Sequence, residues 1–148
     1  MITYEELNLQ NHKITELTNI LKLLLGDRIL CDADTTHELV LRYMDLVQTH
    51  IHDTETDVYT VLLAKGDQQA RNAANSFMSG SKEIKRIYKS YLKQWCKKDT
   101  CALVIKDFDR FQNDTGELFE NVLDRIQAET EQLYPLVRKV TGDQGIVS

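Results

Sequence analysis

Apolar residues recur at the spacing of an α-helix along four long segments, and this pattern constrains the fold more than any other feature of the sequence. In the first segment Ile14, Leu17 and Leu21 lie three or four residues apart, so they share one face of a helix. No segment alternates between apolar and polar residues, as a half-buried strand does. Because the chain has one proline and six glycines, few residues interrupt long helices. The sequence therefore predicts an all-α fold.

Capping residues give the bounds of four predicted helices. Thr3 with Glu6, and Thr35 with Glu38, have the spacing of a capping box, in which both side chains accept hydrogen bonds from backbone N–H groups at the start of a helix. A glycine is expected to end each of the helices that these boxes begin. The predicted helices cover about residues 3–25, 35–66 and 67–96, and a last stretch that begins between 101 and 107 and ends near 141.

Short links between four helices favour an antiparallel up-down-up-down four-helix bundle. A chain of 148 residues has the size of one domain, so we expect residues 1–148 to form a single bundle with a frayed tail from about residue 142. The third helix is predicted to be one long helix in which residues 79–81 could form a kink, and residues 113–116 are where a turn or kink could lie in the last one. An alternative puts an extra short helix at 101–111, before the last long helix.

Composition and charge exclude several classes of protein. The net charge of −5 argues against nucleic acid or an anionic membrane as the main partner. No apolar run approaches the ~18 residues of a membrane span, and the first residues do not resemble a signal peptide. We therefore expect a cytoplasmic protein whose cysteines are free thiols. Basic residues between 82 and 98 alternate with apolar ones, as on the solvated face of an amphipathic helix.

Motifs of several enzyme classes are missing from the sequence. It has no glycine-rich phosphate loop and no Gly-x-Ser-x-Gly turn. The Glu-x-x-His pattern of ferritin-like di-iron proteins does not occur either. We therefore predict that the protein is not an enzyme.

Two segments, one starting at His50 and the other at Arg125, look alike. In each, Ile follows the first residue, a Glu-Thr pair lies in the middle, and a Tyr lies nine places on. A His and a Glu four residues apart on each of two helices would form a metal-binding layout, because both side chains lie on one helix face. Neither segment is complete, since His50 is followed by Thr54 and Glu129 is preceded by Arg125.

This layout resembles the hemerythrin-like, or HHE cation-binding, family over nearly the whole chain. The resemblance implies a four-helix bundle that holds two irons, with one His from each of helices one and three and a His-x-x-x-Glu from each of helices two and four. By this resemblance His12, His50 and Glu129 correspond to metal ligands. Thr54 stands in the place of the bridging Glu, and Arg125 in the place of the helix-four His. The third predicted helix contains no His.

The missing ligands change what the resemblance implies. Arg125 is a permanent cation that cannot bind a metal, so its guanidinium, if it points inward, would take the place of a metal ion and pair with Glu129. We therefore predict a non-catalytic signalling or regulatory module that has a protein partner. It would have no cofactor, or a single divalent cation held by His12, His50 and Glu129. A di-iron centre would need a ligand set that differs from the family pattern.

Two alternative functions stay open. The first is a functional non-haem iron protein that binds oxygen or nitric oxide through an altered ligand set. The second rests on residues 43–63, which are similar to a helix of the regulator of sigma D family, bacterial four-helix bundles that bind a sigma factor and carry no di-iron centre. Apart from the ligands named above, His37 and the polar group around His52 and Glu55 are expected on the solvated surface.

Overall fold

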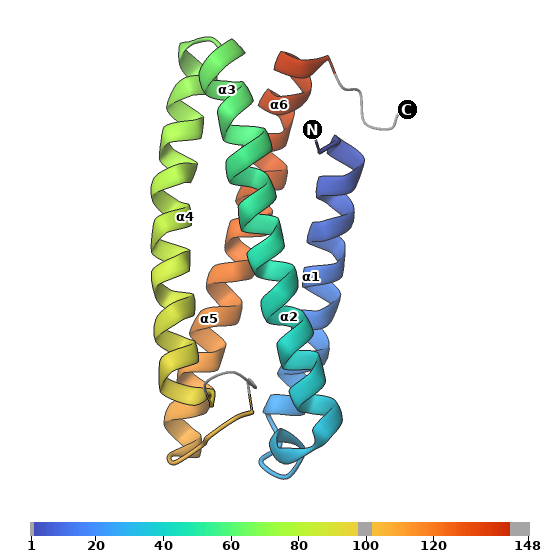
Figure 1. The fold of residues 1–148 in the computed structure, drawn as a ribbon, viewed down its shortest axis with the longest axis vertical. Coiled ribbons are helices and arrows are strands. Elements are labelled where there is room, and N and C mark those ends of the chain that lie inside the picture. The colour runs from blue at the N-terminus through green and yellow to red at the C-terminus, as the bar shows by residue number, and fades with distance from the viewer. Residues whose placement is uncertain (1, 98–101, 143–148) are drawn as a thin grey trace.

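The structure, a computed structural model, describes residues 2–97 and 102–142. These residues form a helical bundle without a strand, which confirms the predicted all-α fold (Figure 1). The first two long segments are α1 (Tyr4–Leu25) and a continuous run of α2 (Asp34–Asp53), a π-helical segment (Thr54–Tyr59) and α3 (Thr60–Lys65). The last two are α4 (Gln68–Trp95) and a run of α5 (Phe108–Ala128), a second π-helical segment (Glu129–Leu133) and α6 (Tyr134–Thr141).

Connections between the long segments lie at alternating ends of the bundle (Figure 1). The link from α1 to α2, with a 3₁₀ turn at Leu30–Asp32, lies at the lower end of the view, and the link from α3 to α4 lies at the upper end. Between α4 and α5, Cys96 and Leu103 form an isolated β-bridge. Residues 102–107 are not helical, so the extra short helix predicted at 101–111 is wrong for that part of the range.

The predicted start of the first helix is confirmed, and that of the second is wrong. Thr3 caps α1 through its hydroxyl, which accepts from the backbone N–H of Glu6 at 3.1 Å, and the Glu6 carboxylate completes the capping box. Helix α2 begins at Asp34, after Ala33, and has no side-chain cap. Thr35 is already inside the helix, so its hydroxyl does not lie at the capping position.

Helix α4 is one long helix, as predicted, and both α4 and α5 continue through their glycine-containing stretches. Residues 79–81 lie within α4 and residues 113–116 within α5. The changes in helical geometry fall instead on Thr54–Tyr59 and Glu129–Leu133. These two π-helical segments belong to the two stretches that look alike in the sequence. Single π-helical turns within α-helices occur frequently at functional sites.

Two apolar clusters fill the bundle, one towards each end. The cluster towards the α1–α2 link includes Ile14, Tyr43, Val47, Phe111 and Val122. The cluster towards the α3–α4 link includes Leu7, Val58, Phe77, Leu133 and Tyr134. Along each long segment, therefore, the two clusters are separated by a short stretch near its middle. Polar side chains occupy this stretch in all four segments.

Two further sequence expectations concern cysteines and membranes. Cys31 and Cys96 form no disulfide among the described residues, and Cys101 lies outside them. Within 2–97 and 102–142, no helix combines the length and the apolar character that crossing a membrane requires.

Candidate functional site

A layer of buried polar residues crosses the middle of the bundle. All four long segments contribute side chains to it. Its members lie between the two apolar clusters in sequence as well as in space. Each is at most 5% exposed: Asn11 on α1, His50 and Thr54 on the second segment, Ser81 on α4 and Glu129 on the fourth. Burying a polar group costs free energy unless it is hydrogen-bonded, so the partners of these side chains decide what the layer can do.

His50 links the layer to α1 and to the fourth segment. Its Nε2 lies 2.7 Å from Oε1 of Glu129, and its Nδ1 lies 2.8 Å from Oε1 of Gln10. The Gln10 side-chain nitrogen donates to the carboxylate of Asp53 at 2.7 Å, so the amide oxygen is the atom that faces the imidazole. Each ring nitrogen of His50 therefore lies within hydrogen-bond distance of a side-chain oxygen, so the imidazole bridges Gln10 on α1 and Glu129 on the fourth segment.

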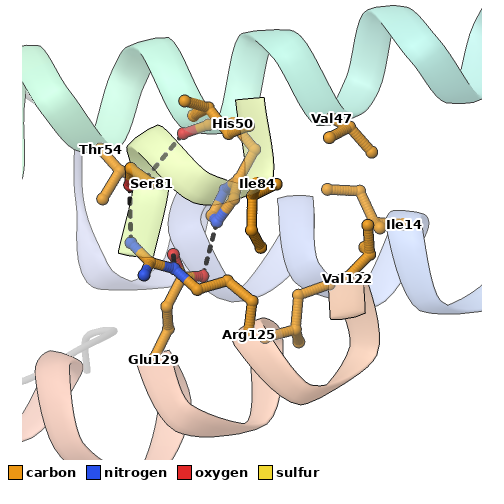
Figure 2. Close-up of a pocket in the computed structure, with 11 residues that line it drawn as sticks. Ile14, Val47, His50, Thr54, Ser81, Ile84, Val122, Arg125 and Glu129 are labelled. Atoms are coloured by element: carbon orange, nitrogen blue, oxygen red, sulfur yellow. Dashed lines mark hydrogen bonds and ion pairs between the residues drawn. The ribbon is translucent and has the colours of Figure 1, made fainter. Parts of the chain in front are cut away.

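Arg125 brings a guanidinium cation into the layer (Figure 2). Its side chain is 15% exposed, and Nε donates to Oε2 of Glu129 at 3.3 Å. The terminal Nη2 reaches the carbonyl of Phe77 at 2.9 Å, the hydroxyl of Ser81 at 2.7 Å and the hydroxyl of Tyr59. The guanidinium also lies over the Phe77 ring, 4.7 Å from its centroid, in the geometry of a cation–π contact. Arg125 therefore points inward and pairs with Glu129, which meets the condition that the sequence left open.

The carboxylate of Glu129 is the anion on which the layer converges. Besides His50 and Arg125, it accepts from the hydroxyl of Tyr134 at 3.3 Å. Tyr134 in turn accepts from the side-chain nitrogen of Asn11 at 2.7 Å. Both oxygens of the Glu129 carboxylate are therefore engaged, by side chains from the second and the fourth long segments.

Thr54 does not join the charged contacts. Its hydroxyl donates to the backbone carbonyl of His50, one turn earlier, at 2.7 Å, as Figure 2 shows. Thr54 is 1% exposed, so this local bond satisfies a buried hydroxyl that faces the layer. A glutamate at this position would place another carboxylate beside Glu129. The sequence instead carries a small side chain that bonds to its own helix.

Gly80 provides the space that the Arg125 guanidinium occupies. A Cβ atom at Gly80 would lie 2.6 Å from Nη1 of Arg125, closer than real Cβ contacts allow. Glycine in a helix interior costs about 1 kcal/mol relative to alanine. The glycine in the middle of α4 therefore has a structural reason, which is the close approach of the arginine from α5.

A small cavity borders the charged groups. It has a volume of about 20 Å³, which is enough for one water molecule. His50, Arg125 and Glu129 lie on one side, and apolar side chains such as Val47 and Ile84 lie on the other (Figure 2). The free space beside the layer is therefore far too small for an organic substrate of ordinary size.

The structure places the other predicted polar residues outside the layer. The prediction that His12 lies on the core side of the first helix is wrong, because its side chain is 69% exposed and contacts Glu16 at 3.5 Å. A helix turns by about 100° per residue, and it is the neighbouring Asn11 that points inward. His52 is exposed, as expected, while Glu55 is half-buried and pairs with Lys85.

His37 is less exposed than the sequence suggested. The residue is half-buried, and its Nε2 is buried without a hydrogen-bond partner among the described residues. Its position in the first turn of α2 puts it far along the helix from His50, so it contributes nothing to the charged layer.

Residues that the sequence did not single out complete the layer. Asn11 and Gln10 on α1 contact Tyr134 and His50, and Ser81 on α4 contacts Arg125. Asn11 could have been found, because it lies four residues after Leu7 in the apolar stripe of the first helix. Gln10 gave no such signal, since it lies beside the stripe and reaches inward only through its long side chain.

Comparison with known proteins does not name the site: no family model matches the chain, no curated protein is significantly similar to it, and neither is any solved structure. Function must therefore be argued from the geometry. Within 2–97 and 102–142, no three His, Cys, Asp or Glu side chains are arranged to hold a metal ion.

Tyr134 makes the stability of the layer depend on pH. Burial, together with the Glu129 carboxylate, raises the pKa of Tyr134 well above its ordinary value of ~10. The unfolded chain then loses this proton at lower pH than the folded chain, so the stabilisation is complete below pH ~10 and is lost as the pH rises further. Above pH 10, the free energy of unfolding should fall with rising pH in the wild type more than in Tyr134→Phe. The two slopes should differ by about 1.4 kcal/mol per pH unit. Urea titrations at several pH values measure both slopes, and equal slopes would show that Tyr134 is not the group responsible.

Proposed function

We propose that the protein is a hemerythrin-like, antiparallel up-down-up-down bundle in which a charged hydrogen-bonded layer takes the place of the metal centre. On this proposal it is a non-catalytic regulatory module that acts through contacts with a protein partner. The alternating ends at which the long segments connect support the antiparallel order (Figure 1). The charged layer supports the proposal that a metal centre has been replaced. All four segments contribute polar side chains at one level of the bundle, as the ligands of a metal centre would.

The position of the Arg125 guanidinium is the observation that carries this proposal. It lies one helical turn before Glu129, where the family resemblance puts a histidine ligand, and it binds that same glutamate. Arginine cannot ligate a metal, and a cation beside a site repels one. The protein therefore supplies, from its own side chain, a positive charge that a metal ion would otherwise supply to Glu129.

The remaining candidate ligands do not fit a di-iron centre. Both ring nitrogens of His50 are in hydrogen bonds, whereas a metal needs a free lone pair on a neutral imidazole. Both oxygens of Glu129 are hydrogen-bonded as well, and Thr54 offers no bridging carboxylate. A single divalent cation at His12, His50 and Glu129 has no support either, since the exposed His12 does not reach the other two.

The small size of the cavity beside the charged layer supports a regulatory rather than a catalytic role for that layer. The cavity beside the charged layer holds about one water molecule, and the charged groups already bind one another. A small helical bundle of this kind can still act as a regulator through its surface. A protein-interaction role like that of the regulator of sigma D family stays a separate alternative, which likewise needs no metal.

Metal analysis tests the proposal directly. Protein purified without chelators should contain less than about 0.1 iron per chain, because the site lacks free ligands for it. Addition and removal of a chelator should leave the thermal midpoint unchanged. Elemental analysis and near-ultraviolet absorption provide the measurements. About two irons per chain, with a charge-transfer band, would instead establish a functional non-haem iron protein.

A further inference from the structure

The surface between α1 and α2 carries a groove that the charged layer does not explain. These two helices lie side by side in Figure 1. Apolar side chains line part of the groove: Leu9, which is 51% exposed, and the half-buried Leu46. Carboxylates line the rest, with Asp53 and Asp57 from the second long segment, and Lys13 is the one basic residue among the lining side chains. An exposed leucine beside acidic groups is a surface that a partner can cover.

The two aspartates have no basic partner among the described residues. Asp53 accepts from the side chain of Gln10, and Asp57 accepts from the backbone N–H of Ile2 at 2.9 Å. Neither forms an ion pair with a described Lys, Arg or His. Because Asp53 and Asp57 are four residues apart on one helical face, they present two negative charges in a row along the groove. A ligand with two positive charges at helical spacing complements them.

We propose that this groove is the docking site for a positively charged amphipathic helix of a partner protein. Leucine-like side chains of that helix would cover Leu9 and Leu46, and its Lys or Arg side chains would pair with Asp53 and Asp57. This is the helix-in-groove mode of recognition, in which apolar anchors give affinity and charges give orientation and rate. The carboxylates repel nucleic acid and anionic lipid, so a basic protein segment is the occupant that the charges favour. The proposal specifies the partner of the regulatory module and rests on that function.

Gln10 gives the groove a direct connection to the buried layer. One end of its amide donates to Asp53 in the groove wall, and the other end accepts from His50. A partner cation on Asp53 competes with the Gln10 nitrogen for the same carboxylate. Binding therefore acts on a side chain that belongs to the charged layer. The Gln10 side-chain amide resonances report this effect.

The test uses synthetic amphipathic helical peptides with Leu and Lys at i, i+3, i+4 and i+7, and matched peptides in which Glu replaces Lys. Titrated into ¹⁵N-labelled protein, the Lys peptides should shift the resonances of residues that line the groove, together with the Gln10 side-chain amide. The Glu peptides should not bind. No binding of Lys peptides at millimolar concentration, or shifts confined to another face, would overturn the docking site while leaving the metal analysis unaffected.

Charge-neutral variants distinguish peptide binding in the groove from a general attraction of the Lys peptides to a negatively charged protein. In Asp53→Asn/Asp57→Asn the asparagine oxygens can keep the bonds to Gln10 and Ile2, so only the charges are lost. We expect the Lys peptides to bind about fivefold to tenfold more weakly, as for two exposed ion pairs. Glu120→Gln/Asp124→Asn, which removes the same charge from the exposed face of α5, should change the affinity less than twofold. Equal weakening by both variants would overturn the proposal.

A second copy of the chain is the competing occupant, because α4 carries exposed basic residues at helical spacing. Sedimentation equilibrium at increasing protein concentration decides this point. We expect a monomer throughout. A dimer that Asp53→Asn/Asp57→Asn abolishes would assign the groove to self-association and overturn the heterologous partner.

Discussion

Replacement of Arg125 by leucine should lower the free energy of unfolding by about 3–5 kcal/mol. Leucine removes the cation beside the buried Glu129 and leaves the carbonyl of Phe77 without the charged donor that reaches it. Breaking one side of a buried ion pair costs this much because the other charge stays in a medium of low polarity. Urea unfolding followed by circular dichroism measures the change.

Arg110→Leu is the matched control for this variant, since Arg110 lies on the same helix but is exposed. Exposed substitutions of this kind change stability by about 0.5 kcal/mol or less. If Arg125→Leu had an effect as small as that of Arg110→Leu, the guanidinium would not hold the charged layer together. The double variant Arg125→Leu/Glu129→Leu should lose less stability than the sum of the two single variants, because it leaves neither charge of the pair unmatched.

The sequence was sufficient to predict the helices because their apolar stripes are long and regular. A stripe such as Ile14, Leu17 and Leu21 is read from residue type alone, and its burial follows from the need to remove apolar surface from water. The start of α2 was not predictable in the same way. Thr35 and Glu38 have the spacing of a capping box, but the capping position is Ala33, two residues before Thr35, so that spacing does not apply.

The centre of the site was predictable, and its periphery was not. His50, Arg125 and Glu129 were found because they lie in the apolar stripes of long helices, where a polar residue must have a partner. The prediction that His12 faces the core was wrong because the family motif was matched by residue type rather than by position on the helix face. A shift of one residue turns a side chain by about 100° around the helix axis. The inward position belongs to Asn11, which a strict reading of the stripe indicates.

The π-helical segments show a limit of reading a sequence by its periodicity. Both begin one turn after a residue of the layer, at Thr54 after His50 and at Glu129 after Arg125. The likeness of the two stretches pointed to a shared role, but an α-helical period of 3.6 residues cannot indicate where a wider turn is inserted. The side-chain contacts across the bundle became visible only when the four segments were placed together in space.

Gly80→Ala should destabilise the protein by about 0.5–2 kcal/mol, although alanine is the better helix former. The added Cβ would lie 2.6 Å from Nη1 of Arg125, so the guanidinium must move away from α4. Its bonds to Ser81 and to the carbonyl of Phe77 come from that same helix and would be lost or lengthened. Hydrogen bonds to charged groups contribute about 1.5–3 kcal/mol, which outweighs the ~1 kcal/mol gained in helix propensity.

Gly116→Ala provides the matched control on α5. No atom lies within 4 Å of a Cβ built at Gly116, so this variant should be more stable than the wild type by about 0.5–1 kcal/mol. In the Arg125→Leu background the guanidinium is absent, and Gly80→Ala should then become neutral or stabilising. Urea unfolding of the four proteins of this double-mutant cycle gives the coupling between positions 80 and 125. A stabilising Gly80→Ala in the wild-type background would show that the guanidinium moves freely. Arg125 could not then be the fixed internal cation on which the replacement of the metal centre depends.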